Sequence, residues 1–344
     1  MKKNIICLGL GKNQLNLIKY LIKDFNIIGI DRSNNKKIKK FIHSYYKSSI
    51  YDLPSINRVA QDLIKKKIKI FAIIYRSSGP TILSAALLER KFKINRINNN
   101  LKYSIYSKSY FSRFLKMNKI DFLPSYKIKY SLLSKKRGEY ILKPDAPISG
   151  KKNIFLMKDK IYYKNFIECK VESHNKKVNY SRFFSGKDIS SFYVVNNNKN
   201  INCLIAHVEE FNAFKNGKLF HYGLCAPPII NNNDILYKKE KVDKSIIKSF
   251  SNFYGIISIS SKILKNHSVL PYEVNIGLSG DKFADHIFPY LFKNRSLYKI
   301  EIDMAIFKTK KNMNYNSNKF IGFFKNKKIM SKKNFLSKIN KYNF

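Results

Sequence analysis

The sequence predicts an α/β region at the amino terminus and an α+β region after it. In about the first ninety of the 344 residues, short apolar strands alternate with amphipathic helices. After the run Asn98-Asn99-Asn100 this alternation stops, and short strands and turns predominate. Alternating strands and helices form right-handed βαβ units, so the first region is expected to contain a parallel sheet.

Four apolar runs predict the strands of the first region, and Leu15, Ile18 and Leu21 recur at the spacing of a helix after the first strand. Further helices are expected in the lysine-rich run up to Phe41, from Pro54 onward and from Pro80 onward. The expected strands are Asn4–Leu8, Asn26–Ile30, Tyr46–Ile50 and Ile68–Tyr75.

The second region combines many strands with two expected helices, Tyr103–Met117 and Val242–Tyr254. The first of these helices ends before Pro124, because proline cannot continue a helix. A hairpin is expected around Asn326. The expected strands are Ser125–Lys129, Glu139–Lys143, Asn153–Met157, Lys160–Tyr163, Val178–Phe184, Ile189–Val195, Asn202–Val208, Gly255–Ile263 and Val269–Asn275.

Lysine dominates the charge of the chain. Lys and Arg number 67 and Asp and Glu 22, which gives a net charge of +45, yet only nine of the basic residues are arginines. Nucleic-acid surfaces favour arginine, whose planar fork pairs with phosphate and guanine. Here lysine is spread along the chain with abundant Asn, Ile, Phe and Tyr, as an A+T-rich genome produces. We therefore expect no specific nucleic-acid partner, although the end, Lys308–Phe344, is basic and free of acids.

Composition also argues against several other classes. An apolar share of 44% with 14% aromatics indicates a globular chain rather than a disordered one. No apolar run approaches the roughly 18 residues of a membrane span, and the amino terminus does not read as an export signal. The four cysteines lie far apart, so neither a zinc site nor a disulfide framework is indicated. We expect a reduced, cytoplasmic protein without a membrane partner.

Gly9-Leu10-Gly11 follows the first strand and opens a helix, and Asp31 ends the second strand. This arrangement can hold a dinucleotide, because glycines admit the pyrophosphate and an acid binds the ribose. Gln14 stands where the third glycine of that fingerprint belongs. We therefore favour the alternative, a tight turn of the kind that any parallel sheet needs.

Lys143 ends an apolar strand and is followed by Pro144 and the loop Asp145–Lys152. A lysine at the end of a buried strand, facing a loop, suits a polyphosphate, which needs a point charge and backbone N–H groups. The alternative is an ordinary surface lysine on a hairpin.

Glu273 and Asn275 lie two residues apart on an expected strand, so their side chains share one face. Two oxygen ligands on one face suit a magnesium ion that bridges phosphates. Considered alone, the polar face of an edge strand is the more ordinary explanation.

Two weaker candidates concern the substrate. Arg76, Ser77 and Ser78 follow a strand and precede a helix, where a carboxylate could bind Arg76 and backbone N–H groups. A simple helix start explains them equally well. Three histidines, His207, His221 and His286, lack the spacing of metal ligands. Of these, only His221 is a weak substrate-site candidate.

In their order and spacing, these pieces resemble the ATP-grasp superfamily of carboxylate–amine ligases over roughly residues 1–305. The pieces are the Gly-turn domain, a helix carrying Lys108, the Leu142-Lys143-Pro144 strand end and its loop, the run Phe183–Ser190, and Glu273-Val274-Asn275. The resemblance implies a Rossmann-like amino-terminal domain followed by a two-subdomain ATP-grasp fold. It also implies that ATP phosphorylates a carboxylate and that an amine or similar nucleophile displaces the phosphate.

The resemblance assigns roles to particular residues, with ATP and Mg²⁺ as cofactors. Lysines would contact the phosphates, the loop after Lys143 would cover them, and two phenylalanines would lie at the hinge against adenine. This chemistry is positioning and charge neutralisation, so no catalytic side chain is assigned. The residues implied for ATP are Lys108, Lys143, Ser149, Gly150, Phe183 and Phe184, and those for magnesium are Glu273 and Asn275.

Three positions depart from the pattern of the superfamily. Because hard cations prefer anionic oxygens, the loss of a metal-binding carboxylate is expected to weaken magnesium binding. Asp281 or Asp285 could substitute for it. The departures are Ser181 or Arg182 for an acid in the hinge, Ser258 or Ser260 for the metal-binding acid, and Gly277 for an arginine.

The expected domains are a Rossmann-like domain at 1–97, an ATP-grasp domain at 98–305 with a small lid subdomain at 125–182, and a basic carboxy-terminal extension at 306–344. The expected function is ATP-dependent ligation of a small-molecule carboxylate and an amine, and a homodimer is allowed. Two rivals stay open: a catalytically impaired ATP-grasp-like protein that binds a nucleotide or a partner, and a basic nucleic-acid-binding protein.

Overall fold

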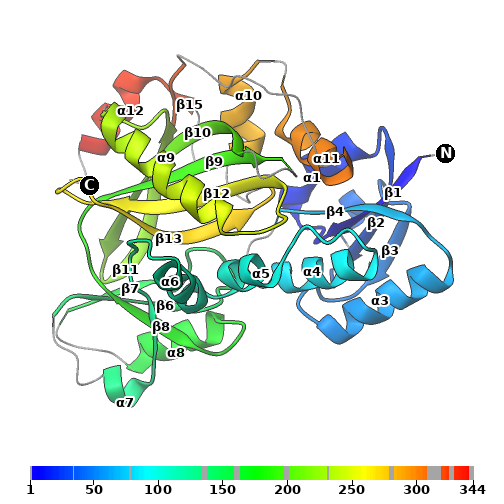
Figure 1. Cartoon of the computed structure of the whole chain (residues 1–344), viewed down its shortest axis with the longest axis horizontal. Helices are drawn as coiled ribbons and strands as arrows, with labels where there is room; N and C mark the ends of the chain where they lie inside the picture. Colours follow the sequence, from blue (N-terminus) through cyan, green and yellow to red (C-terminus); the bar gives the residue numbers. More distant parts are fainter. Residues whose placement is uncertain are drawn as a thin grey trace.

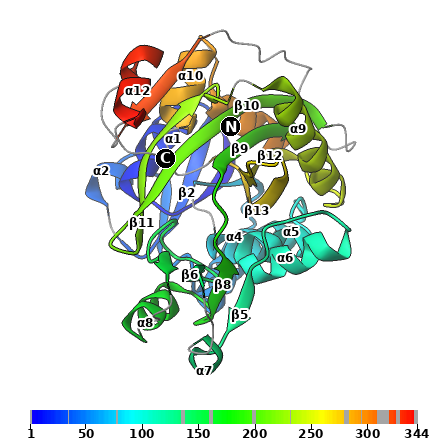
Figure 2. The ribbon, with the colours of Figure 1, turned by 90° about the vertical axis from the view of Figure 1, so that its left-hand side faces the viewer.

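The computed structural model of the chain describes residues 2–33, 35–76, 79–133, 138–158, 163–196, 201–230, 232–278, 283–293, 295–307, 319–324 and 329–340. Two sheets organise these residues, a small one on the right of Figure 1 and a large one on the left. Figures 1 and 2 both show one end of the large sheet, with the short helices α7 (Tyr130–Leu133) and α8 (Tyr163–Glu172) beside it, extending below the rest. None of the described helices is long and apolar enough to cross a membrane.

The small sheet is parallel, and its strands run in the order β3-β2-β1-β4. Its central strands bury four consecutive residues each, as expected for a parallel sheet covered on both faces. The expected α/β region is confirmed, although its third strand ends at Lys47 rather than Ile50. The elements are β1 Lys3–Leu8, α1 Leu15–Leu21, β2 Phe25–Asp31, α2 Lys36–Lys39, β3 Ser44–Lys47, α3 Leu53–Lys65, β4 Ile70–Tyr75 and α4 Thr81–Lys91.

The large sheet is antiparallel, in the order β13-β12-β9-β10-β11-β7-β6-β8-β5, with β14 and β15 joined to β11. The sequence did not predict β11, and it predicted only the first part of β10. The strands are β5 Tyr126–Ile128, β6 Tyr140–Pro144, β7 Phe155–Met157, β8 Val178–Arg182, β9 Lys187–Val195, β10 Ile201–Lys215, β11 Lys218–Ala226, β12 Gly255–Ile263, β13 Val269–Ile276, β14 Ile321–Phe324 and β15 Ile329–Met330.

The helices of the second region differ from the sequence prediction in three places. The predicted helix Tyr103–Met117 is two helices, because the Ser107 hydroxyl caps the second one. The predicted strand Lys160–Tyr163 is wrong at Tyr163, which begins a helix; residues 160–162 lie outside the described residues. The late helix begins at Asn233, earlier than predicted, because Asn232 caps it. The helices are α5 Asn99–Tyr106, α6 Lys108–Met117, α7 Tyr130–Leu133, α8 Tyr163–Glu172, α9 Asn233–Lys248, α10 Phe288–Leu291, α11 Leu297–Phe307 and α12 Lys332–Ile339.

Two large hydrophobic clusters span both sheets. One joins Ile5 of β1 to Phe192 of β9, and the other joins Ile6 of β1 to Tyr193 of β9. A third cluster is separate and lies wholly within residues 125–182. Its buried members are Leu133, Leu142, Phe155, Met157, Phe166, Cys169 and Val178.

Arg96 joins the two sheets through a buried ion-pair cluster. Its guanidinium pairs with Glu89 of α4 and lies 3.2 Å from Glu301 of α11, and it donates a hydrogen bond of 2.9 Å to the Ile73 carbonyl of β4. Removing one partner of a buried ion pair typically costs about 3–5 kcal/mol. The cluster therefore adds polar ties to the apolar contacts between the small sheet and the large one.

The basic carboxy-terminal stretch contributes structure to the large sheet. Strand β14 pairs with β11 and β15, which confirms the hairpin predicted around Asn326, and all four residues of β14 are buried. Phe335 of α12 is fully buried against β14 at Gly322, where a Cβ would lie 2.6 Å from the phenyl ring. Only glycine allows this close packing, so α12 is fixed to the sheet.

Candidate functional site

A cavity of about 310 Å³ lies where β6, β9, β12 and β13 come together with the start of α6. Five residues assigned through the superfamily resemblance line it together: Lys108, Lys143, Phe183, Phe184 and Glu273. They come from positions up to 165 residues apart in the chain. The remaining lining residues are Leu123, Ile141, Lys151, Ile154, Ser181, Arg182, Ser185, Gly186, Asp188, Asn212, Ala213, Phe214, Leu219, Lys262 and Tyr272.

Lys108 enters this cavity because Asp145 fixes the start of α6. The fully buried Asp145 carboxylate accepts hydrogen bonds from the Ser107 hydroxyl at 2.8 Å, the Ser109 N–H at 3.0 Å, Asn175 at 2.6 Å and Asn179 at 2.7 Å. Burial opposes ionisation of Asp145, yet the bonds from Ser109, Asn175 and Ser107 outweigh it and lower its pKa. Asp145 thereby joins the end of β6 to the first turn of α6.

Lys143 is the most unusual charge in the cavity. Its side chain is only 6% exposed, and it makes no hydrogen bond or ion pair with any residue that the structure describes. Burial, reinforced by the nearby charge of Lys108, lowers its pKa to about 7. A buried cation without a partner is costly, so this position is built to receive an anion.

Glu273 faces the lysines from β13. Its carboxylate lies 3.2 Å from the Lys108 ammonium, and Asn275 on the same strand face donates a hydrogen bond of 3.5 Å to it. Burial opposes ionisation of Glu273, but the charges of Lys108 and Lys151 hold its pKa below the ordinary value. Glu273 and Asn275 therefore share one strand face, as the alternation of side chains along a strand predicts, although Asn275 itself does not line the cavity.

Two polar rows cross the large sheet beside Glu273. In the first, Lys262 of β12 lies 2.8 Å from Asp188 of β9, and Asn212 of β10 donates a 3.0 Å bond to the same carboxylate. In the second, Ser260 of β12 lies 2.7 Å from Ser190 of β9. Both rows continue the polar surface on which Glu273 stands.

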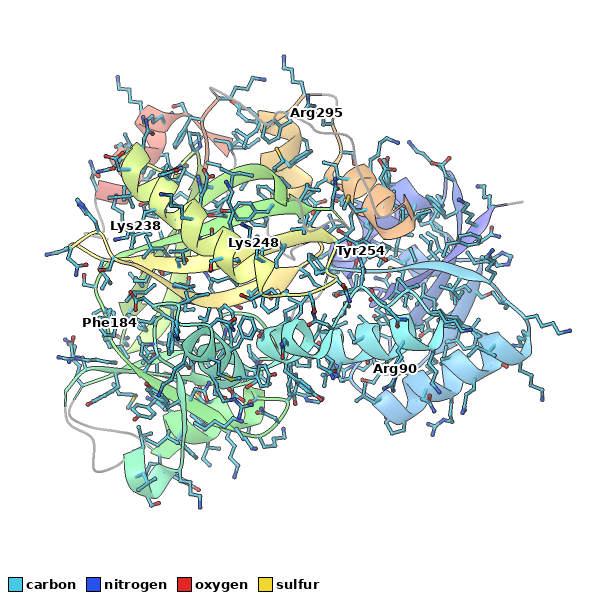
Figure 3. The ribbon with its side chains drawn as sticks, viewed as in Figure 1. Arg90, Phe184, Lys238, Lys248, Tyr254 and Arg295 are labelled. Carbon is cyan, nitrogen blue, oxygen red and sulfur yellow. The ribbon has the colours of Figure 1, made fainter. Side chains whose placement is uncertain are left out.

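Phe183 and Phe184 connect the end of β8 to the start of β9, and Phe184 is labelled at this connection in Figure 3. Phe183 packs edge-on against Phe214, with the ring centres 6.0 Å apart. The buried Ser181 hydroxyl has no hydrogen-bond partner among the described residues. This part of the cavity is apolar and carries one unsatisfied polar group, which suits a flat heterocycle with polar edges.

The loop after β6 contributes a residue that the assignment omitted. Ser149 and Gly150 form a turn outside the lining of the cavity, whereas Lys151 lines it and pairs with Glu210 of β10. Lys151 lies within the loop predicted to cover the phosphates, but the sequence does not distinguish it from the neighbouring lysine. What distinguishes it is its ion pair with Glu210, 59 residues later, which only the fold reveals.

The weaker substrate candidates lie elsewhere. Arg76 is buried and pairs with Asp285 at 2.7 Å, so its charge is already matched; Ser77 and Ser78 lie outside the described residues. Asp31 accepts hydrogen bonds from the Leu10 N–H and from Ser33, as in the tight turn that we favoured over a dinucleotide site. The three histidines considered above, His207, His221 and His286, do not line the cavity. His221 forms a hydrogen bond with Asn212, which does line it.

The charges of the cavity define what it can bind. Five cationic side chains line it against two carboxylates, Asp188 and Glu273. Such an excess favours a polyanion such as a polyphosphate. Among the described residues, no group of three or more His, Cys, Asp or Glu could hold a metal by itself. Glu273 and Asn275 fit a hard cation such as Mg²⁺ only where a nucleotide supplies further oxygens.

No protein-family model matches the sequence, and no curated protein matches it. Solved structures do match. An L-amino acid ligase from Bacillus licheniformis is 10% identical to this chain. The two structures match with a TM-score of 0.74 over 93% of this chain and 79% of the ligase chain. An N5-carboxyaminoimidazole synthetase from Staphylococcus aureus, complexed with ADP, is 16% identical with a TM-score of 0.68, covering 94% and 82%.

A third structure is the biotin carboxylase domain of a 2-oxoglutarate carboxylase from Hydrogenobacter thermophilus, in complex with MgADP. It is 13% identical with a TM-score of 0.68, and the match covers 94% of this chain and 74% of that one. At these identities the matches show the fold. The resemblance to the ATP-grasp carboxylate–amine ligases is therefore confirmed for the fold of nearly the whole chain.

Proposed function

We propose that this chain, whose fold is that of the ATP-grasp carboxylate–amine ligases, is an ATP-dependent ligase. It would activate a small-molecule carboxylate as an acyl phosphate, which an amine or similar nucleophile then attacks. The observation that carries this proposal is the cavity in which the buried Lys143, which pairs with none of the described residues, lies beside Lys108 and opposite Glu273. Unrelated surface lysines do not gather in this way around a carboxylate.

The cavity divides into parts that suit the parts of a nucleotide. The apolar end at Phe183 and Phe184 would hold the adenine, with the unsatisfied Ser181 hydroxyl within the same lining. Lys108 and Lys143 would bind the phosphates. The negative charge of the phosphates would offset the burial and the repulsion from Lys108 that lower the pKa of Lys143. Glu273 and Asn275 would hold Mg²⁺, which would neutralise phosphate charge during transfer.

The reaction needs positioning more than a reactive side chain. An oxygen of the substrate carboxylate attacks the terminal phosphorus, ADP leaves, and the amine then displaces phosphate from the acyl carbon. Lys108 and Lys143 would hold the transferred group in line and stabilise charge on its oxygens. Exclusion of water matters because the acyl phosphate hydrolyses, and the loop that carries Lys151 is the segment beside the cavity that could provide it.

We propose the following division of the chain around this site. Residues 1–97 would be a Rossmann-like domain on the substrate side, residues 98–305 the ATP-grasp domain and 125–182 its lid. The separate hydrophobic cluster within 125–182 supports the last boundary. Residues 306–344 would be an extension that completes the large sheet through β14. We also propose a cytoplasmic location and a homodimer.

The test is a screen of metabolite carboxylates and amines for ADP release with Mg²⁺ and ATP. Wild type should release ADP with at least one pair, and Glu273→Gln should abolish that release, because it removes the anionic metal ligand without changing shape. Glu168→Gln removes a carboxylate of α8 that does not line the cavity and should act like wild type. Equal ADP release by wild type and Glu273→Gln would refute the assignment of Glu273.

One observation favours a second candidate, a nucleotide-binding protein of this fold that no longer turns over. Ser260 and Ser258 are neutral on the strand beside Glu273, where the superfamily has a carboxylate. Such a protein would bind ADP yet release none with any substrate pair. Restored turnover in Ser260→Asp alone would identify it.

A further inference from the structure

A second cavity, of about 550 Å³, shares no lining residue with the cavity around Lys143. Part of its lining comes from α5 and α6, and much of the rest comes from β5 and from the turn between α8 and β8. Strand β5 lies against α6 (Figure 2). A molecule in this cavity would therefore contact both these helices and the segment 125–182. A cavity of this size suits one small molecule.

Tyrosine side chains provide the flat surfaces of this second cavity. Four of them line it: Tyr103, Tyr106 and Tyr110 from α5 and α6, and Tyr126 from β5. The rings of Tyr103 and Tyr110 lie 5.4 Å apart, and Tyr103 and Tyr126 are 39% and 52% exposed. The whole chain has 23 tyrosines in 344 residues, so four in one cavity are a local concentration. Partly exposed rings of this kind can stack on the face of a nucleobase.

Positive charges accompany the tyrosine rings. Four cations line the second cavity, and none of the described Asp or Glu residues does: Arg113 and Lys116 of α6, Lys127 of β5, and Lys177. Arg113 is one of only nine arginines in the chain, and its guanidinium lies 4.9 Å from the centre of the Tyr110 ring. A guanidinium placed on a ring, with ammonium groups nearby, can bind the oxygens of a phosphate.

Asp145 leaves the charge of the second cavity unmatched. Its carboxylate lies 3.9 Å from the Lys127 ammonium, but it is fully buried and does not line the cavity. The same carboxylate already accepts the four hydrogen bonds that fix the start of α6. The side chain of Lys127 is 47% exposed and can turn towards a ligand.

The abundance of lysine does not by itself produce such a cavity. A third cavity, of about 560 Å³, is lined from β10, α9 and α12 among other elements. Its charges are mixed, because three acids line it together with two lysines: Asp188, Glu209, Glu210, Lys187 and Lys265. The second cavity differs from it by its four tyrosines and by the absence of a described acid from its lining.

We infer that the second cavity binds a nucleotide, at a site separate from the one that the proposed function places beside Lys143. The base would stack on the tyrosine rings, and Arg113 and Lys127 would bind the phosphates. Because the lining comes from both the segment 125–182 and the helices α5 and α6, this nucleotide would hold the two together. The inference stands whether or not the first cavity catalyses ligation.

The test is photolabelling with an ADP analogue that carries an azide on its base, without Mg²⁺, followed by mapping of the labelled residues. This readout separates the two cavities. Label on Tyr103, Tyr110 or Tyr126 reports the second cavity, and label within residues 181–186 reports the first. Wild type should be labelled on the tyrosines, and unmodified ADP should compete with this label at physiological salt.

The decisive variant is Arg113→Gln/Lys116→Gln, which removes two exposed cations from α6 and keeps every tyrosine. It should raise the ADP concentration that halves the tyrosine label at least about tenfold. The matched control is Lys238→Gln/Lys241→Gln. It removes two exposed lysines at the same spacing on α9, where Lys241 lies over the exposed Tyr237, and should change that concentration less than about twofold.

Two further arms test the role of the base. Pyrophosphate, which has no base, should compete at least about tenfold more weakly than ADP. Tyr126→Leu keeps an apolar side chain on β5 but removes a ring, and it should weaken ADP competition at Tyr103 and Tyr110. Thermal unfolding of each variant checks that the fold is retained.

Three results would overturn the inference: no label on the tyrosines of wild type, equal competition by ADP and pyrophosphate, or equal effects of the α6 and α9 variants. Tighter competition by a single-stranded oligoadenylate RNA than by ADP at physiological salt would also overturn it, in favour of nucleic acid. Labelled tyrosines without label at 181–186 would support this inference and count against the nucleotide site of the proposed function.

Discussion

Replacing Lys143 with methionine removes the buried cation while keeping a flexible side chain of similar length. In the free protein the pKa of Lys143 is lowered from 10.5 to about 7, first by burial and then by Lys108. At about 1.36 kcal/mol per pKa unit, this shift means that a charged Lys143 costs the folded state roughly 5 kcal/mol. Lys143→Met should therefore be more stable than wild type in the absence of nucleotide.

The pH dependence has a definite sign. Between pH 7 and 10.5 the unfolded chain keeps a proton on Lys143 that the folded chain has lost. Stability from this group therefore rises as pH increases across that window. Urea unfolding of wild type should show the rise, and Lys143→Met should show a smaller one.

Nucleotide binding should reverse the pKa shift, because a phosphate beside Lys143 favours its charged form. At pH 8 a group with a pKa of about 7 is mostly neutral, so ADP binding should take up close to one proton. Calorimetry in two buffers of different ionisation enthalpy measures this uptake. Lys143→Met should lose the uptake and, since charge-assisted bonds are worth about 1.5–3 kcal/mol, bind ADP tenfold or more weakly. Equal affinity and equal proton uptake in the two proteins would refute the phosphate role of Lys143.

Two further predictions concern the scaffold. Asp145→Ala leaves the donors of Ser107, Ser109 and both asparagines unmatched and should destabilise the protein by about 3–5 kcal/mol in urea unfolding. Because its folded pKa is lowered, the stability from Asp145 should be present above about pH 4 and be lost as pH falls below that, in wild type only. Phe335→Ala should cost about 3 kcal/mol although it lies in the basic extension, and an unchanged unfolding midpoint would show that α12 is not fixed to the sheet.

The sequence predicted the site residues that depend on local geometry. Glu273 and Asn275 share a face because side chains alternate along a strand. Lys143 lies near the end of a strand whose apolar residues can be recognised in the amino-acid sequence. The same reasoning predicted most strands of both sheets.

Residues whose role depends on distant pairing could not be predicted. Glu210 joins the row of Ser190 and Ser260 only through the order β12-β9-β10, which no local pattern encodes. Arg76 looks free in the sequence, yet its partner Asp285 lies 209 residues later. Ser107 reads as a helix interior, and its role as a cap is fixed by Asp145, 38 residues away.

The Arg96 cluster has a consequence for how the cavity can open. Arg96 ties the small sheet to α11, and two apolar clusters join that sheet to β9 and β12, so we expect these parts to move together as one frame. The strands within 125–182 have their own cluster, and Asp145 ties them to the start of α6, so we expect them to move as a unit about Asp145 if the cavity opens. Lys151 travels with that arm, while Glu210 and Glu273 stay on the frame. A nucleotide bound both to this arm and to the frame would hold the cavity closed. Release of the nucleotide would then limit the rate at which the arm reopens.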